Sequence, residues 1–135
     1  MDYTTLGSTG LKVSVAGLGC GGNSWIGLGA GLSDAESVAL VRAAYDLGVT
    51  FFDTAEAYGT EHILGLAFAP SERGKVVIST KSQIRKGGEL ISAADLIANL
   101  DASLVRLKTD HVDVFQLHGV PPADPRRFAS SSSRS

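Results

Sequence analysis

Residues 48–55 read Gly-Val-Thr-Phe-Phe-Asp-Thr-Ala, a short run of β-branched and aromatic residues with an acid near its end. Two further runs of this kind occupy residues 75–81 and 111–118. Such runs are typical of buried β-strands. We therefore predict three strands that each carry a polar residue at the carboxyl end. These polar residues are Asp53, Lys81 and His118.

Helical patterns lie between the predicted strands. Ser33 and Ser92 each precede an acid by three residues, the spacing of a capping box, so helices are expected to begin at both positions. The first helix should end at Gly48, and a short helix is expected over residues 61–68, before Pro70. The helix that begins at Ser92 has a leucine stripe, made of Leu96, Leu100, Leu104 and Leu107.

The amino-terminal part has a different pattern. Short β runs over residues 3–6 and 11–15 flank a Gly-Ser-Thr-Gly turn and predict a hairpin. Residues 15–19 follow as a first buried strand, which leads into a glycine-rich loop over residues 19–31. Strands that alternate with helices favour a parallel sheet with right-handed crossovers. We expect an α/β fold with about four parallel strands and three helices, preceded by the hairpin.

The predicted strands bring polar side chains to one rim. Alternate residues of a strand share a face, so Asp53, Lys81 and His118 can face the same side at the carboxyl ends of parallel strands. Tyr58 lies five residues beyond Asp53. An acid, an amine, an imidazole and a phenol at one rim indicate a proton-transfer site. The side chains expected to point toward the helices instead are Phe52, Ile78, Phe115 and Leu117.

The composition is typical of a soluble globular domain. The chain has 135 residues, and its formal net charge of −2 gives no case for nucleic-acid binding. Residues 13–33 carry no charge, but their seven glycines and three serines make them a poor membrane span. The single cysteine, Cys20, and the lack of a signal-peptide pattern favour the cytoplasm. His62 and His111 have no second ligand at metal spacing, so no metal site is expected.

The strand and helix pattern stops after His118. Residues 121–135 are rich in proline and serine and have no hydrophobic periodicity. We expect one partial domain over residues 1–120 and a disordered tail over residues 121–135.

The residues of the predicted site also resemble a known family. Residues 48–55, followed by Tyr58, resemble the first signature of the aldo-keto reductase superfamily. Lys81 after its strand and His118 after residues 113–117 match the lysine and the histidine of that family. Matching all of these spaced positions makes the resemblance specific.

The resemblance extends over most of the chain and implies a fold. Residues 17–21 resemble the family's first strand and loop, and the predicted hairpin resembles the one that closes the bottom of the family's barrel. Val49 and Thr50 depart from the commoner signature, which bears on the subfamily rather than on the chemistry. The implied fold is the N-terminal half of a (β/α)8 TIM barrel.

The resemblance implies NADP(H)-dependent reduction of aldehydes, ketones or sugars. Tyr58 would give a proton to the carbonyl oxygen, and the ammonium of Lys81, held by Asp53, would favour the ionised phenol. His118 would donate a hydrogen bond to the same oxygen and orient the substrate. The nicotinamide would bring the hydride, so the reaction needs no metal and no protein nucleophile.

The resemblance also implies contacts outside this group of four. Gly21, Gly22 and Asp53 would contact the cofactor, and Trp25 with His118 would contact the substrate. Trp25 is equally well explained as a packed loop aromatic. In the family, the second half of the barrel supplies most contacts to the cofactor.

Each candidate also has a structural explanation when it is taken singly. Asp53 suits a turn, Tyr58 a surface aromatic, Lys81 a solvated strand end, and His118 a contact with a backbone carbonyl. Their joint register and the family resemblance favour a site.

A second hypothesis is a non-catalytic half-barrel fragment or interaction module. Half a barrel leaves strand edges unpaired, so the 135-residue chain is expected to associate with itself, to bind a partner half or to be unstable. We expect little or no turnover from this chain alone.

Overall fold

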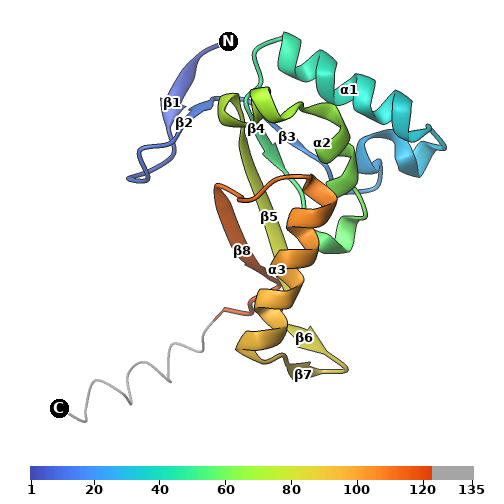
Figure 1. Ribbon diagram of the computed structural model, residues 1–135, viewed down its shortest axis with the longest axis vertical. Coiled ribbons are helices and arrows are strands. Elements are labelled where there is room, and N and C mark those ends of the chain that lie inside the picture. Colours follow the sequence, from blue (N-terminus) through green and yellow to red (C-terminus); the bar gives the residue numbers. More distant parts are fainter. Residues whose placement is uncertain (123–135) are drawn as a thin grey trace.

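A parallel sheet of four strands, in the order β3-β4-β5-β8, is the frame of the computed structural model, which describes residues 1–122 (Figure 1). Each strand begins two or three residues later than predicted, and β5 runs past Lys81 because it pairs with β8 as far as Gln83. The predicted parallel sheet is confirmed. Its strands are β3 (Gly17–Gly19), β4 (Phe51–Asp53), β5 (Val77–Gln83) and β8 (Val114–His118).

Three α-helices lie together on one side of this sheet (Figure 1). The two longer helices begin at the predicted capping boxes, where the hydroxyls of Ser33 and Ser92 each accept a hydrogen bond from the backbone N–H three residues further on. Gly48 follows the first helix with φ of 99°, a left-handed conformation that glycine adopts without strain. The helices are α1 (Asp34–Asp46), α2 (Glu61–Ala67) and α3 (Ala93–Leu107).

The predicted hairpin is formed by β1 (Tyr3–Thr5) and β2 (Lys12–Ser14). It lies at the amino-terminal end of the sheet, opposite the end where β5 leads into a second hairpin over residues 85–90 (Figure 1). Ser14 and Thr50 fix it there, because each backbone N–H donates to the other residue's hydroxyl, at 3.0 and 2.9 Å. Since Thr50 directly precedes β4, the hairpin is tied to the start of that strand.

Several short elements were not predicted. They are too short to show a periodic pattern. Gly87 and Gly88, both with positive φ, form the turn of the second hairpin, and this Gly-Gly pair is the sequence signal for it. The elements are the 3-10 helices η1 (Trp25–Ala30), η2 (Glu56–Tyr58) and η3 (Pro70–Lys75), and the hairpin strands β6 (Arg85–Lys86) and β7 (Glu89–Leu90).

The hydrophobic core lies between the sheet and the helices. Phe52 and Ile78 belong to it, as predicted, and the ring of Phe52 meets that of Phe68 edge-on at 5.0 Å between centroids. Leu117 lies on the same side of the sheet, beside Leu96 in an apolar pocket of about 210 Å³. It remains 51% exposed, because the described elements do not cover the outer side of β8.

A buried carboxylate joins α2 to β5 and α3. Glu61 is 1% exposed and accepts hydrogen bonds from Thr80 Oγ1 at 2.5 Å and from Arg106 Nε at 2.6 Å. Burial of an ionised group is costly unless it is paired and hydrogen-bonded, and these contacts satisfy it. One turn further along α2, a Cβ on Gly65 would lie 2.4 Å from the carbonyl oxygen of Arg106. The two helices can therefore approach this closely only with glycine at that position.

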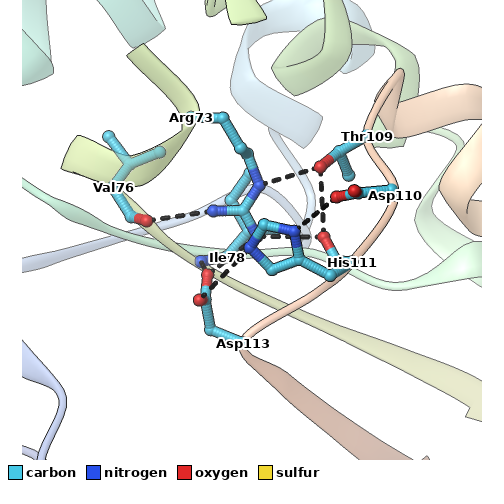
Figure 2. Close-up of polar contacts among 7 residues, drawn as sticks. All are labelled: Arg73, Val76, Ile78, Thr109, Asp110, His111 and Asp113. Atoms are coloured by element: carbon cyan, nitrogen blue, oxygen red, sulfur yellow. Dashed lines mark hydrogen bonds and ion pairs between the residues drawn. The ribbon is translucent and has the colours of Figure 1, made fainter. Parts of the chain in front are cut away.

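A polar network fixes the start of β8 (Figure 2). The Asp113 carboxylate accepts hydrogen bonds from Arg73 Nη2 and from the backbone N–H of Ile78, both at 2.8 Å. Arg73 also donates to the carbonyl oxygens of Val76 and His111. Because Asp113 directly precedes β8 and Ile78 lies in β5, the network holds the register of these two strands.

Among the helices of residues 1–122, none combines the length and the apolar character that a membrane span requires. The predicted tail, residues 121–135, falls almost wholly outside the described residues. The division of the chain at residue 120 therefore stays a prediction.

Gly65→Ala is expected to destabilise the chain by about 1–3 kcal/mol, because the added Cβ overlaps the backbone of α3. Gly74→Ala is the matched control: a Cβ there meets no atom within 4 Å, so a change within about 0.5 kcal/mol is expected. Urea unfolding followed by circular dichroism measures both variants. Equal stabilities would contradict the close packing of α2 on α3.

Candidate active site

The four predicted side chains come from separate segments that meet at the carboxyl-terminal end of the sheet. Asp53 ends β4, His118 ends β8, Lys81 lies in β5, and Tyr58 ends the short helix η2 after β4. The register pairs Asp53 with Ser79, and Lys81 lies two residues further along β5. Since alternate residues of a strand share a face, Lys81 projects on the same side of the sheet as Asp53.

An ion pair joins Lys81 to Asp53. Lys81 Nζ donates to Asp53 Oδ2 at 2.6 Å and to the carbonyl oxygen of Thr54 at 2.9 Å. The Lys81 side chain is 14% exposed, so its ammonium lies largely out of water and needs these partners. The two contacts fix the position of the nitrogen at the rim of the sheet.

Three residues lie around the ring of Tyr58. Lys81 Nζ is 5.1 Å from the centroid of the Tyr58 ring, and the imidazole of His118 meets that ring edge-on, 5.7 Å away at 86°. Gly21 also contacts the ring: a Cβ on that glycine would lie 2.7 Å from two of the ring carbons. The structure thus brings together all four side chains and Gly21, so two of the three predicted cofactor residues, Gly21 and Asp53, lie here.

The imidazole of His118 has one nitrogen inside the protein. Its Nδ1 is buried and has no hydrogen-bond partner within residues 1–122. A buried N–H without an acceptor is costly, so the neutral ring is better accommodated with its proton on Nε2. This tautomer makes Nε2 a hydrogen-bond donor.

The sequence prediction missed the contact between Gln116 and Ser79. Gln116 Nε2 donates to Ser79 Oγ at 2.7 Å, and Ser79 is fully buried. The register pairs Ser79 with Asp53 and Gln116 with Lys81, so this bond lies next to the ion pair. The pattern does place Gln116 on the same face as His118, but no local signal indicates which residue of the neighbouring strand it meets.

The loop after β3 holds the other predicted contact residues. Gly22 has φ of 70°, and a Cβ there would meet no atom within 4 Å. Trp25 is 46% exposed, which argues against a packed loop aromatic. Within residues 1–122, no hydrogen bond or ring contact joins Trp25 to the four side chains.

The backbone of this loop is strained. Trp25 and Ile26 have φ of 43° and 50°. Side chains of this size rarely adopt such values, which cost on the order of 1–3 kcal/mol per residue and recur at functional sites. The structure therefore holds the exposed Trp25 in place at a cost in stability.

Cys20, at the end of β3, is fully buried, and no set of three or more metal-ligating side chains occurs in the described part of the chain. Burial raises the pKa of the Cys20 thiol from its ordinary value of 9.0 to about 12, and the nearby charge of Asp53 adds to this effect. The thiol is therefore protonated at neutral pH and behaves as an apolar group.

Comparison with known proteins identifies the family. Residues 17–131 match the family model of the aldo/keto reductase family, and the chain belongs to this family. It is 35% identical over 136 residues to the aldo-keto reductase YhdN of Bacillus subtilis (strain 168), and 36% identical over 126 residues to the L-galactose dehydrogenase of Arabidopsis thaliana. The alignments cover 93% and 89% of this chain, but only 40% and 39% of those relatives.

Solved structures agree with this assignment. The holo form of aldo-keto reductase AKR11C1 from Bacillus halodurans superposes with a TM-score of 0.76 at 29% identity, over 94% of this chain and 43% of that one. The thermostable aldo-keto reductase Tm1743, in complex with the inhibitor epalrestat, gives a TM-score of 0.69 at 30% identity, over 99% and 50%. The chain therefore spans two-fifths to one half of the length of these relatives. Both the predicted family and the predicted partial TIM barrel are confirmed.

Iodoacetamide at about pH 8 is expected to modify Cys20 very slowly in the folded chain, because a rise of the pKa from 9.0 to about 12 lowers the thiolate fraction about a thousandfold. Mass spectrometry of the alkylated protein measures the rate. The same reaction in urea is the control and should proceed at the rate of an ordinary thiol. Rapid labelling without urea would contradict the buried position of Cys20.

Proposed function

We propose that this chain carries the catalytic residues of an NADP(H)-dependent oxidoreductase that reduces aldehydes or ketones to alcohols. Its membership of the aldo-keto reductase family and the oxidoreductases among its relatives support this reaction class. The observation that carries the proposal is the position of the Tyr58 phenol, between the Lys81–Asp53 ion pair and the His118 imidazole.

Carbonyl reduction needs a hydride at the carbon and a proton at the oxygen. Tyr58 donates the proton. The positive charge of Lys81 stabilises the negative charge that develops on the phenol oxygen as the proton leaves. Asp53 holds the Lys81 ammonium in position through the 2.6 Å hydrogen bond.

His118 acts on the other side of the reacting oxygen. Its Nε2–H donates a hydrogen bond to the carbonyl oxygen, which polarises the carbonyl and fixes its orientation toward Tyr58. The buried, unpartnered Nδ1 supports this role, because it favours the tautomer that carries the proton on Nε2.

The glycines at the end of β3 suit a nicotinamide cofactor, which supplies the hydride when bound. A Cβ on Gly19 or on Gly22 would meet nothing within 4 Å, and the register pairs Gly19 with Asp53. The backbone beside Asp53 is therefore open at these two glycines, as close contact with a flat ring requires. Gly21, Gly22 and Asp53 would contact this cofactor, which we take to be NADP(H) by analogy with the family.

Trp25 and His118 contact the substrate, a small aldehyde, ketone or sugar. The exposure of Trp25 and the strained backbone that holds it support this assignment. The L-galactose dehydrogenase among the relatives supports a sugar as one candidate. The single, buried cysteine supports a reducing compartment such as the cytoplasm.

Complementation with a relative tests the reaction. Residues 1–120 are expressed with the carboxyl-terminal part of YhdN, of which this chain matches 40%. We expect aldehyde-dependent oxidation of NADPH, followed at 340 nm, and a loss of at least about a hundredfold in Tyr58→Phe, because general acid catalysis typically contributes 10²–10⁴-fold.

Tyr45→Phe is the matched control, since Tyr45 packs against Phe68 away from the site. It should keep the activity of the assembled parent. An assembled complex that binds NADPH and turns over equally well with Tyr58→Phe would overturn the proposed role of the phenol. One that binds NADPH but reduces no aldehyde would overturn the proposed reaction.

The 135-residue chain on its own has a second candidate function, as a non-catalytic module that associates with itself. Within residues 1–122, the outer edge of β8 pairs with no strand, and Leu117 beside it is 51% exposed. An open strand edge flanked by apolar side chains favours pairing with another chain.

Light scattering on the 135-residue chain is expected to give a mass above that of a monomer, and Leu117→Asp should shift it toward the monomer. Leu66→Asp is the matched control, because Leu66 is 49% exposed on α2, away from β8. A monomer at every concentration, or equal dissociation by both variants, would contradict association through this edge.

A further inference from the structure

The turn that carries Tyr58 has one backbone hydrogen bond of its own and one side-chain contact with β5, in which the Gln83 N–H donates to Glu56 Oε1 at 3.0 Å. Its backbone bond runs from the Tyr58 N–H to the carbonyl oxygen of Ala55 at 3.1 Å, and Gly59 follows with φ of 68°. A three-residue 3-10 helix with one such bond does not fix the direction of a side chain. The position of the phenol must therefore depend on residues outside the turn.

Thr60, two residues after Tyr58, makes such a contact. Its side chain is fully buried, and Thr60 Oγ1 donates to the carbonyl oxygen of Cys20 at 3.0 Å. Thr54 is also fully buried, and its Oγ1 lies 2.9 Å from Thr60 Oγ1. Because the single proton of Thr60 goes to Cys20, the Thr54 hydroxyl is the donor in this second bond.

These two bonds join three segments. Thr54 follows β4, Cys20 follows β3, and Thr60 follows the turn. The N–H of Cys20 donates to the carbonyl oxygen of Asp53 at 2.8 Å, so the residue that accepts from the Thr60 hydroxyl is itself fixed to the end of β4. We call this chain of hydroxyls, from Thr54 through Thr60 to Cys20, the threonine relay.

The threonine relay lies where it can fix the position of the Tyr58 ring. Gly21 directly follows Cys20, and it approaches the Tyr58 ring so closely that a Cβ would lie 2.7 Å from the ring carbons. The bond between Thr60 and Cys20 thus holds Gly21 near the ring through Cys20, its chain neighbour, and through Gly59, which separates Thr60 from Tyr58.

We propose that Thr60 is a positioning residue for Tyr58, acting through the threonine relay. This proposal extends the proposed function and rests on it, because it takes the Tyr58 phenol to be the proton donor. Small displacements of a reacting group lower the rate steeply, so a relay that fixes the ring against Gly21 has a direct chemical consequence.

Nuclear magnetic resonance on the 135-residue chain tests this without cofactor or substrate. In the parent chain, cross-relaxation is expected between the ring protons of Tyr58 and those of Gly21 and His118. Thr60→Val, which keeps the shape but removes the hydroxyl, should lose the Tyr58–Gly21 signal. Thr60→Ser, which restores the hydroxyl, should keep it.

Ser103→Ala is the control for general loosening, because Ser103 is a buried hydroxyl of α3 whose partner is Arg106, on the helical side of the fold. It should keep the Tyr58 signals even where the thermal midpoint falls as far as in Thr60→Val. Thr54→Val removes only the first bond of the relay and should weaken the Tyr58–Gly21 signal, which provides a second test if Thr60→Val does not fold.

Retention of the Tyr58–Gly21 signal in every folded variant that lacks a relay hydroxyl would overturn the proposal, as would its equal loss in Ser103→Ala. These outcomes are separate from the proposed function. If the relay variants lose the Tyr58–Gly21 signal but the complex has no reductase activity, the positioning role stands and the proposed function fails. If the complex is active and Thr60→Val keeps the signal, only the positioning role fails.

Discussion

The parallel register of β4, β5 and β8 is the constraint on which the whole site depends. Lys81 lies 28 residues from Asp53 in the chain, and only the adjacency of the strand ends brings them to 2.6 Å. A slip of one residue would turn a side chain to the opposite face. Asp113 opposes such a slip in β8, because its carboxylate accepts hydrogen bonds both from Arg73 and from the backbone of β5. The place of His118 at the far end of β8 follows from this contact.

Buried polar groups on the helical side of the sheet support the charged groups on the other side. Thr80 and Lys81 are neighbours in β5 and point in opposite directions. The hydroxyl of Thr80 donates to the buried Glu61, while the ammonium of Lys81 donates to Asp53. Glu61 is held in turn by Arg106 of α3. A displacement of β5 would break hydrogen bonds on both faces, so the ammonium is presented from a rigid strand.

Local signals explain which elements could be predicted. The capping boxes at Ser33 and Ser92 involve residues three apart, so the two helix starts follow from the sequence. The ends of β4 and β8 likewise follow from residue types, which placed Asp53 and His118 at one rim, whereas β5 runs past Lys81 to Gln83. Leu117 was expected among the residues that face the helices and lies on that side, but its burial depends on what covers β8, and the residue pattern of one strand carries no such information.

The sequence by itself determined the three α-helices, the four parallel strands, the first hairpin, and the polar residues near the carboxyl ends of three of those strands. The tertiary structure alone decided how the phenol of Tyr58 is oriented and which hydroxyls hold it. The bond between Thr60 and Cys20 joins residues 40 positions apart, and the contact of Gly21 with the Tyr58 ring spans a similar distance in the chain. Periodicity and capping report on residues within about one or two helical turns of each other. Contacts between segments depend on how the sheet pairs and how the helices pack upon it, so they appear only in the folded chain.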